Sequence, residues 1–211
     1  MLLYLIRHGE SLYNREGRIQ GQTDIALTDF GRQQAQAIAH GMRNVKLDAI
    51  FASPLQRAYQ TAVPIAEQKG LPIQVHNGLK EVNAGVFSGL LWPEVTEKYP
   101  QYAEPWNNQD LDFVIPEGES RRILQNRGVQ ALQEIAATPY NVVAVVAHGG
   151  LLCASLKGIF QIPDAIHPFS LFNASISRLG WNEGKWQLIT LNQTEHLVQS
   201  GVANESGRGN L

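Results

Sequence analysis

Three polar clusters that could do chemistry each follow an apolar run in the sequence. Arg7 and His8 come directly after the run that ends at Ile6, Arg57 lies shortly after a second run, and His148 follows a third, VVAVVA. Arginine forks match the oxygens of a phosphate and stay charged at any working pH. An imidazole can attack phosphorus and form a covalent phosphoryl-enzyme, which water later opens. These residue types therefore predict a phosphate site with a histidine nucleophile.

This chemistry also needs a carboxylic acid, which protonates the departing oxygen and later activates water. Glu81 follows a short predicted strand and has glycines on both sides, and we predict that it does both. Arg7, Arg57 and a protonated His148 would then neutralise the phosphoryl oxygens. The sequence has no HxxxH or CxxC spacing, so we expect no metal ion and no cofactor.

Alternating strands and helices must position these residues. Buried-strand patterns occur at 2–6, 49–52, 73–75 and 141–147, with helical periodicity between them and a hairpin predicted around the turn at 182–184. We therefore expect an α/β fold, a three-layer α/β/α sandwich with a mostly parallel central sheet and one antiparallel edge strand or hairpin. Because parallel strands end at the same edge of a sheet, the polar clusters should converge there.

Capping residues predict where two of the helices begin. Thr28 is a plausible N-cap, and Asp29 after it complements the helix dipole. Ser53 is expected to cap the next helix, with Pro54 as its first helical residue. That start would place Arg57 in the first helical turn, just past the end of a strand.

The chain is expected to form one catalytic domain over residues 1–200, followed by a flexible tail over 201–211. Residues 87–116 show no long regular pattern and are rich in aromatic side chains: Trp92, Tyr99, Tyr102, Trp106 and Phe113. Such a stretch is either a lid-like insertion, spanning about 86–116, or a satellite hydrophobic cluster. The sequence leaves both interpretations open.

Composition narrows the class of protein. The chain has 211 residues, a net charge of −2 and one cysteine, Cys153, which predicts a reducing compartment, the cytoplasm. A near-neutral charge argues against a nucleic-acid partner, and no apolar run is long enough to cross a membrane. The expected partner is a small phosphorylated molecule, and the edge hairpin could also pair with a second copy in a homodimer.

The same residues resemble a known family. Arg7-His8-Gly9-Glu10-Ser11 is similar to the signature of the histidine phosphatase superfamily, in its phosphoglycerate-mutase-like branch. Four further segments resemble later motifs of that family in the correct order: Ser53 to Ala62, Leu79 to Gly85, Pro116 to Ser120, and Val146 to Gly150. Any one of these motifs is weak alone, and their agreement in register over about 200 residues is what makes the resemblance specific.

The resemblance implies a role for each matching residue. By analogy His8 is the phosphorylated nucleophile, and Glu81 is the proton donor. The residues expected to hold the phosphoryl group are Arg7, Arg57 and His148. Those expected to line the substrate site are Asn14, Gln20 and Gly21, together with Gly149, which opens a helix whose N–H groups face an anion.

Three functions compete for this set of residues. The leading one is a metal-independent phosphomonoesterase that acts on a small metabolite, and the alternative is a 2,3-bisphosphoglycerate-dependent phosphoglycerate mutase. A catalytically inactive phosphate-binding protein is the third. A mutase must hold strongly anionic intermediates, yet Lys98 is the only base between Val82 and Pro116. The Arg-His-Tyr cluster that related mutases carry after the acid–base glutamate is also absent, so charge complementarity favours the phosphatase.

The remaining polar residues are expected to have ordinary roles. Cys153 lies among apolar residues and should be a small core residue rather than a nucleophile. The residues expected to be surface, packing or structural groups are His40, His76, His167, His196, Arg121, Arg122 and Arg127.

Overall fold

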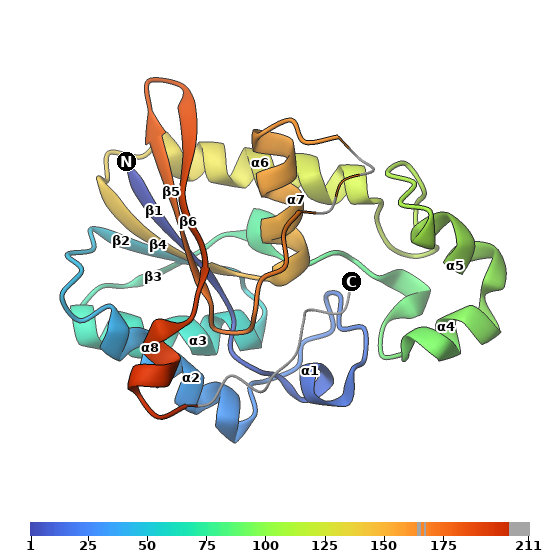
Figure 1. Cartoon of the computed structure of the whole chain (residues 1–211), viewed down its shortest axis with the longest axis horizontal. Helices are drawn as coiled ribbons and strands as arrows, with labels where there is room; N and C mark the ends of the chain where they lie inside the picture. The colour runs from blue at the N-terminus through green and yellow to red at the C-terminus, as the bar shows by residue number, and fades with distance from the viewer. Residues whose placement is uncertain (164–165, 167, 203–211) are drawn as a thin grey trace.

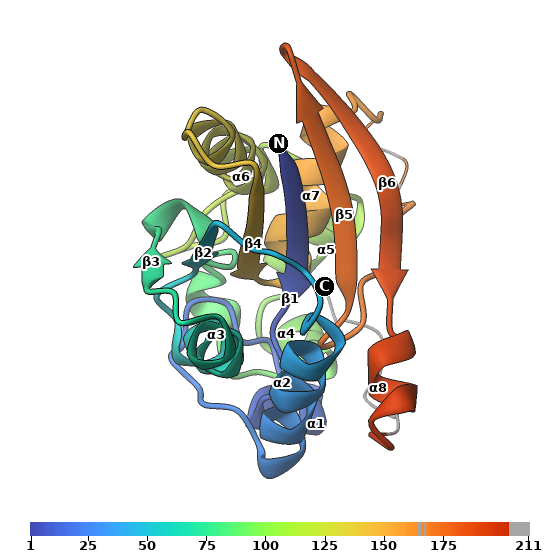
Figure 2. The same cartoon turned by 90° about the vertical axis from the view of Figure 1, so that its left-hand side faces the viewer.

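The computed structural model describes residues 1–163, 166 and 168–202, which fold as a three-layer α/β/α sandwich (Figure 1). Six strands form one sheet in the order β3–β2–β4–β1–β5–β6 (Figure 2). Their bounds are β1 Leu2–Arg7, β2 Ala49–Ala52, β3 Ile73–Val75, β4 Val142–Ala147, β5 Ile176–Asn182 and β6 Lys185–Gln193. The first four strands pair in parallel, and the β5–β6 hairpin adds antiparallel strands at one edge. The predicted fold class is confirmed.

Alternating side chains of the central strands build a hydrophobic core on each face of the sheet. In β4, Val143 and Val145 point to one core, whereas Ala144 and Val146 point to the other. Helices α6 (Arg121–Ala136) and α7 (Gly149–Ile159) cover the first face. Helices α2 (Asp29–Gly41), α3 (Gln56–Lys69) and α8 (Glu195–Gln199) cover the second. Burial on both faces explains why the strand reads as a continuous apolar run.

Helix α2 begins as predicted, and helix α3 does not. The Thr28 hydroxyl accepts a hydrogen bond from the Gly31 N–H at 3.0 Å. Helix α3 starts at Gln56 rather than Pro54, and Leu55, not Ser53, is its N-cap. A carboxylate from a distant segment supplies the missing cap, because Asp24 accepts the Gln56 N–H at 2.7 Å. Local sequence could not reveal a cap that comes from thirty residues away.

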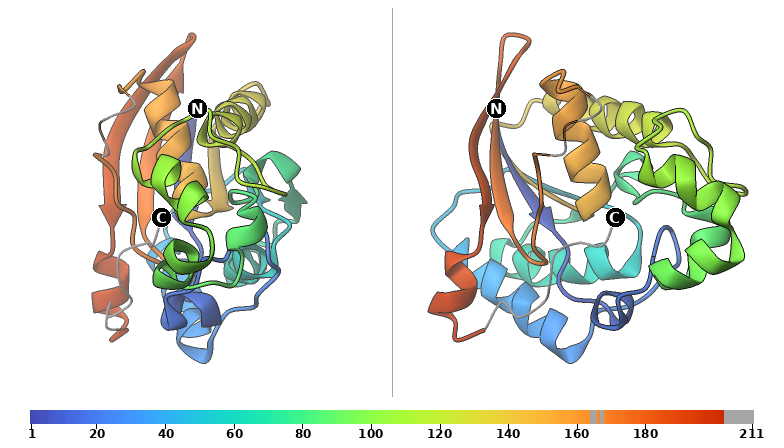
Figure 3. Two further views of the ribbon diagram at one scale, coloured as in Figure 1. Left: turned by 90° about the vertical axis from the view of Figure 1, so that its right-hand side faces the viewer. Right: turned by 45° about the vertical axis from the view of Figure 1, so that its right-hand side comes forward.

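The aromatic segment contains two short helices, α4 (Trp92–Lys98) and α5 (Pro100–Asn107), that lie away from the sheet (Figure 3). Neither is long enough to show a clear period in the sequence. Phe87 packs at the centre of the segment, with ring centroids 6.1 Å from Trp92, 6.5 Å from Tyr99 and 6.3 Å from Trp106. These rings belong to the hydrophobic core on the α6–α7 face of the sheet, so the segment is not a separate satellite cluster, and Trp106 also lines the cavity described below.

Three short elements complete the described fold: α1 Leu12–Glu16, η1 Asn77–Leu79 and η2 Gly85–Phe87. Within the described part of the chain, no helix is both long and apolar enough to cross a membrane. The predicted tail is described only at Gly201 and Val202, so its remaining residues lie outside the described residues, as does His167. The division into a catalytic domain with a lid-like insertion stays a prediction.

Candidate active site

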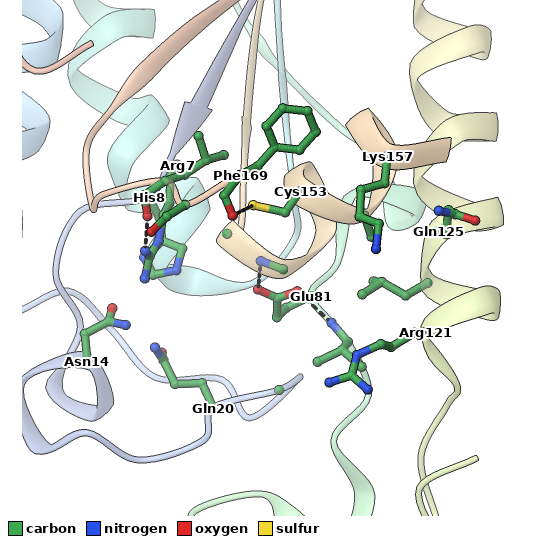
Figure 4. A pocket seen from close by; sticks show the side chains of 18 of the residues that line it. Arg7, His8, Asn14, Gln20, Glu81, Arg121, Gln125, Cys153, Lys157 and Phe169 are labelled. Atoms are coloured by element: carbon green, nitrogen blue, oxygen red, sulfur yellow. Dashed lines mark hydrogen bonds between the residues drawn. The ribbon is translucent and has the colours of Figure 1, made fainter. Parts of the chain in front are cut away.

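The carboxyl ends of the parallel strands open into a cavity of about 480 Å³. Most of the residues predicted from the sequence line it: Arg7, His8, Asn14, Gln20, Gly21, Arg57, Glu81 and Gly149. His148 lies just behind this lining, with its ring centroid 5.1 Å from that of His8. The strand ends thus bring the predicted residues into one place, and Figure 4 shows part of this lining.

His8 is a buried, neutral imidazole whose hydrogen-bonding fixes its tautomer. Its Nδ1 atom lies 2.6 Å from the Gly9 carbonyl oxygen, which can only accept, so Nδ1 carries the proton. The lone pair is then on Nε2. Burial lowers the pKa of His8 well below its ordinary value of 6.5, and the charges of Arg57 and Arg7 lower it further. At neutral pH His8 therefore has an unprotonated nitrogen.

Close backbone packing holds the loop that carries His8. The Gly9 N–H donates to the Thr61 hydroxyl at 3.0 Å. A Cβ atom at position 9 would lie only 2.5 Å from the Gly31 carbonyl oxygen, so no other residue fits without a shift. Gly149 plays a similar part at the start of α7, where a Cβ would lie 3.2 Å from the Arg7 Nε. The glycines that follow the two histidines thus allow the backbone to lie close to neighbouring groups: the Gly31 backbone at Gly9 and the Arg7 side chain at Gly149.

Two buried arginines, Arg7 and Arg57, lie close enough to His8 for their charges to act on its ring. Arg57 donates to the carbonyl oxygens of Gly21 at 2.7 Å and Thr23 at 2.9 Å, and Arg7 donates to that of Leu171 at 2.5 Å. Burial lowers the pKa of Arg57 to about 10, which still leaves it charged at neutral pH. Within the described residues, the Nε atoms of Arg7 and Arg57 are buried and have no hydrogen-bond partner. Buried donors of this kind fit a phosphate oxygen.

His148 is the N-cap residue of α7, and it is fully buried. Its Nε2 lies 2.8 Å from the Ser53 hydroxyl oxygen, and its Nδ1 has no hydrogen-bond partner among the described residues. Burial lowers the pKa of His148 well below its ordinary value, and the charge of Arg57 adds to this effect. The imidazole is therefore neutral, and the predicted protonated form would require a nearby anion to offset the arginine charges.

The carboxylate of Glu81 caps helix α7. Its Oε1 accepts from the N–H groups of Val82 and Leu151, and its Oε2 accepts from that of Gly150, each at 2.9 Å. Arg127 fixes the segment before it, because its guanidinium donates to the carbonyl oxygens of Gly78, Lys80 and Glu81 and pairs with Glu119 at 2.6 Å. Arg127 therefore has the structural position expected from the sequence.

The amide side chains on the opposite wall direct donors into the cavity. The Asn14 Oδ1 accepts from the Ser11 N–H and from the Asn173 side chain, both at 3.1 Å. The Gln20 Oε1 lies 2.6 Å from the Ser11 hydroxyl oxygen. The oxygen ends of these amides are thus engaged within the protein, which leaves their NH₂ groups for a ligand. Asn173 also lines the cavity, and no sequence motif pointed to it.

Several cavity residues were missed or assigned another role from the sequence. Arg121 was expected to be solvated or structural, yet it lines the cavity with Leu124 and Gln125. Their spacing of three to four residues on α6 places them on one helix face and was the available signal. Cys153 also lines the cavity, and burial raises the pKa of its thiol to about 12, which agrees with a non-nucleophilic role.

The lining of the cavity is strongly basic. Of the described residues that line it, Glu81 alone is acidic, against five basic residues: Arg7, Arg18, Arg57, Arg121 and Lys157. The shortage of bases between residues 82 and 116 therefore does not describe the site, because the bases of the cavity come from segments before and after that stretch. Among the described residues, no group of three or more His, Cys, Asp or Glu side chains could hold a metal ion.

Comparisons with known proteins agree with this geometry. The model of the histidine phosphatase superfamily (branch 1) matches residues 3–194. The chain is 36% identical over 204 residues to the metal-independent phosphoserine phosphatase of Arabidopsis thaliana, covering 94% of this chain and 84% of the relative. It is also 36% identical over 186 residues to the probable phosphoglycerate mutase GpmB of Yersinia pestis, covering 87% and 86%.

A solved structure of a mycobacterial glucosyl-3-phosphoglycerate phosphatase with VO3 superposes with a TM-score of 0.82 at 33% identity, covering 92% of this chain and 99% of that one. The family match spans the strand-end motifs and the cavity that they form. The chain therefore belongs to branch 1 of the histidine phosphatase superfamily and is a phosphatase of the histidine phosphatase type.

Proposed function

We propose that this enzyme hydrolyses small phosphomonoesters through a phosphohistidine formed on the Nε2 of His8. The observation that carries the proposal is the neutral imidazole of His8, whose Nδ1–H is fixed on the Gly9 carbonyl and whose Nε2 is left with a lone pair. Arg7 and Arg57 lie beside it, and their buried Nε–H donors have no hydrogen-bond partner in the part of the chain that the structure describes. Such donors would stabilise the charge on the transferring phosphoryl group.

In the first step, the Nε2 lone pair attacks phosphorus and the bond from phosphorus to the alcohol oxygen breaks. The departing oxygen takes the bonding electrons and needs a proton. Glu81 is the acid in this proposal, and its geometry suggests which oxygen carries the proton. Oε1 already accepts two backbone N–H groups, whereas Oε2 accepts one and has a lone pair left.

In the second step, Glu81 takes a proton from water, and the resulting hydroxide attacks the phosphohistidine. Phosphate leaves and His8 regains its neutral form. A bound phosphoryl group would also offset the arginine charges that lower the pKa of His148, so that His148 becomes a charged donor only when substrate is bound. Every step uses side chains of this chain, and the reaction is proposed to need no metal ion.

The proposal is tested by trapping the intermediate. Brief incubation with p-nitrophenyl phosphate labelled in its phosphoryl group should place an acid-labile, alkali-stable label on His8. The His8→Asn variant, whose amide can still donate to the Gly9 carbonyl, should carry no label and turn over roughly 10⁴- to 10⁶-fold more slowly. His40→Asn, a change at an exposed histidine on α2, is the control and should behave like the wild type.

Two outcomes would overturn the proposal. One is labelling of His8→Asn at the wild-type level, which would place the covalent step elsewhere. The other is loss of activity in EDTA that a divalent ion restores, which would require a metal-bound mechanism. Vanadate should inhibit the enzyme, since it mimics five-coordinate phosphorus, and VO3 is present in the similar mycobacterial phosphatase structure.

Mutase activity remains the second candidate, favoured by the basic lining of the cavity and by the relative from Yersinia pestis. A mutase returns the phosphoryl group to an alcohol instead of water. A single assay distinguishes the two functions. It follows phosphate release and, with a 2,3-bisphosphoglycerate primer, the interconversion of 2- and 3-phosphoglycerate. We expect release to dominate, and interconversion faster than release would make the enzyme a mutase.

The setting of the reaction is also a proposal. The single cysteine is consistent with a reducing compartment, and we place the enzyme in the cytoplasm on that ground. A homodimer could form through β6, an edge strand whose outer side presents backbone groups for pairing. Size measurement in solution distinguishes the monomer from the dimer.

A further inference from the structure

One end of the cavity is made by residues that the phosphoryl chemistry does not use. We call it the distal end and define it by four residues: Trp106, Arg121, Gln125 and Lys157. In Figure 4, Arg121, Gln125 and Lys157 lie on the far side of Glu81 from His8. The leaving alcohol must extend from the phosphorus past the proton donor, so the distal end faces that part of a substrate.

Arg121 is held in a fixed orientation. Its guanidinium carbon lies 3.5 Å from the centroid of the Trp106 ring, and one of its NH groups donates to the Trp106 carbonyl oxygen at 2.8 Å. Stacking on an indole and one backbone bond restrict the rotamers of a long side chain. The remaining N–H groups are therefore pre-organised, and a ligand that binds them loses little side-chain entropy.

No carboxylate among the described residues pairs with Arg121 to balance its charge. Burial lowers its pKa to about 10, and its place in the first turn of α6 sets it against the positive end of the helix dipole. Its neighbour Arg122 is different, because it extends outward and donates to Asp112 at 2.9 Å. A half-buried cation without an anion is costly, and a ligand anion would remove that cost.

The rest of the lining strengthens the need for an anion. Lys157 contributes a second cation from α7, and in Figure 4 its amine is directed toward the same end of the cavity. The carboxylate of Glu81 already receives three backbone N–H groups. Arg18, the other cation outside the phosphate site, is paired with Glu16 at 3.1 Å and Glu94 at 3.3 Å. Among the described residues, the cation at this end that has no carboxylate partner is therefore Arg121, and Lys157 adds a second positive charge to the same lining.

We propose that the distal end is a carboxylate subsite, so that the enzyme prefers phosphate esters of hydroxy acids. This inference rests on the proposed reaction at His8, which supplies the phosphate end of the same ligand. The planar fork of Arg121 matches the two oxygens of a carboxylate, Lys157 adds a point charge, and the Gln125 amide can donate beside them. A cavity of about 480 Å³ has room for a phosphoryl group and a short acidic alcohol together.

The test compares substrates that differ only in the carboxylate. O-phosphoethanolamine is O-phosphoserine without its carboxylate, and glycerol 3-phosphate replaces the carboxylate of 3-phosphoglycerate with a hydroxymethyl group. The wild type should hydrolyse the acidic member of each pair with a kcat/KM roughly 10- to 100-fold higher, the effect of one or two hydrogen bonds to a charged group. Agreement between the pairs excludes the amine of phosphoserine as the cause.

Arg121→Gln should remove most of that preference by lowering kcat/KM for the two acidic substrates and leaving the other two unchanged. Arg122→Gln, the adjacent change on the same helix, is the matched control and should alter neither pair. Inhibition by inorganic phosphate reports on the phosphate end and should be the same in Arg121→Gln and the wild type. That measurement also shows that the variant folds.

Equal rates within each pair in the wild type would overturn the carboxylate subsite while leaving the reaction at His8 intact. An equal loss on all four substrates in Arg121→Gln, with weaker phosphate inhibition, would also overturn it, because Arg121 would then support the whole cavity. If none of the four substrates is hydrolysed and His8 takes no label, the proposed function itself has failed.

Discussion

The two ends of the cavity are built on different principles. At the phosphate end, Arg7 is the last residue of β1, and His8 and His148 directly follow β1 and β4. Backbone carbonyls and a hydroxyl fix the orientation of these three side chains. At the distal end, Arg121 and Lys157 come from helices, and the arginine is fixed by the ring of Trp106. The first end depends on the central sheet, and the second depends on how the aromatic segment packs beside helices α6 and α7.

This difference bears on how such an enzyme can change its substrate. The strands that carry these residues contribute side chains to both hydrophobic cores, so substitutions near the strand ends disturb the fold and the chemistry together. The distal residues lie on α6, α7 and the short helix α5, where a substitution changes what the cavity recognises. Chemistry and substrate preference should therefore be separable by mutation, and the predictions below test that separation.

Replacing the proton donor should give the largest effect that depends on the leaving group. General acid catalysis typically contributes ~10²–10⁴-fold, and an alkoxide needs the proton far more than a nitrophenolate does. Glu81→Gln should therefore slow phosphohistidine formation from alkyl phosphates by about that factor and slow it much less with p-nitrophenyl phosphate. The burst phase must be measured, because in the proposed mechanism Glu81 also activates water in the second step.

The carboxylate preference provides the matching control for this experiment. Glu81→Gln should slow both members of each pair, the acidic and the non-acidic alkyl phosphate, to the same degree. A selective loss on the acidic substrates would show that Glu81 also contributes to recognition of the substrate carboxylate. Chemistry and substrate preference would then not be separable by mutation. An equal loss in the burst for all leaving groups would mean that Glu81 organises the pocket rather than donating a proton.

The phosphate end could be predicted from the sequence for a physical reason. A buried parallel strand is a short apolar run, and a polar residue directly after it must lie at the sheet edge where ligands bind. That rule identified His8 and His148 from their neighbours alone. It also identified Arg57 correctly, even though the expected cap at Ser53 was wrong, because the strand end fixes its position more firmly than the cap does.

The distal end could not be predicted in the same way. Arg121 directly follows the N-cap residue Ser120, at a helix start where a solvated or structural arginine is the ordinary expectation. Its importance depends on Trp106, fifteen residues earlier, folding back under it. The two helices of the aromatic segment are too short to show a period, so the sequence held no sign of where that ring would lie. Tertiary packing decides this wall of the cavity.

A smaller effect is expected from the residue that positions Glu81. Arg127→Gln removes a guanidinium that holds three carbonyl oxygens of the segment from Gly78 to Glu81. Displacing a catalytic group by about 1 Å can cost ~10²-fold, so kcat should fall roughly 10- to 100-fold while KM changes little. Because Arg127 acts through Glu81, the loss should again be greater for alkyl phosphates than for p-nitrophenyl phosphate.

Two variants make that result interpretable. Gln130→Ala alters an exposed residue of the same helix that bonds to Glu134, and it should leave kcat unchanged. Arg127→Lys retains the charge but not the fork and should recover only part of the loss. If Arg127→Gln lowers stability but leaves the ratio between alkyl and nitrophenyl substrates unchanged, Arg127 supports the fold without positioning the acid.

The smallest effect concerns stability and separates the two ends by their response to pH. The pKa values of His8 and His148 are lowered in the folded protein, so below pH 6.5 the unfolded chain binds protons that the folded chain does not. The free energy of unfolding should therefore be fully retained above pH 6.5. As the pH falls toward the folded-state pKa values, it should decrease by up to about 1.4 kcal/mol per pH unit for each histidine. Denaturant titrations between pH 7.5 and 5 measure this slope.

His8→Asn and His148→Gln should each make the slope shallower, because each removes one histidine that titrates only in the unfolded chain. Arg121→Gln should leave the slope unchanged, since an arginine does not titrate in this range. Inorganic phosphate should also flatten it, because a bound dianion opposes the arginine charges that lower the pKa of His148. A slope that persists in both histidine variants and disappears in Arg121→Gln would place the pH-sensitive charge at the distal end, and the division between the two ends would then be wrong.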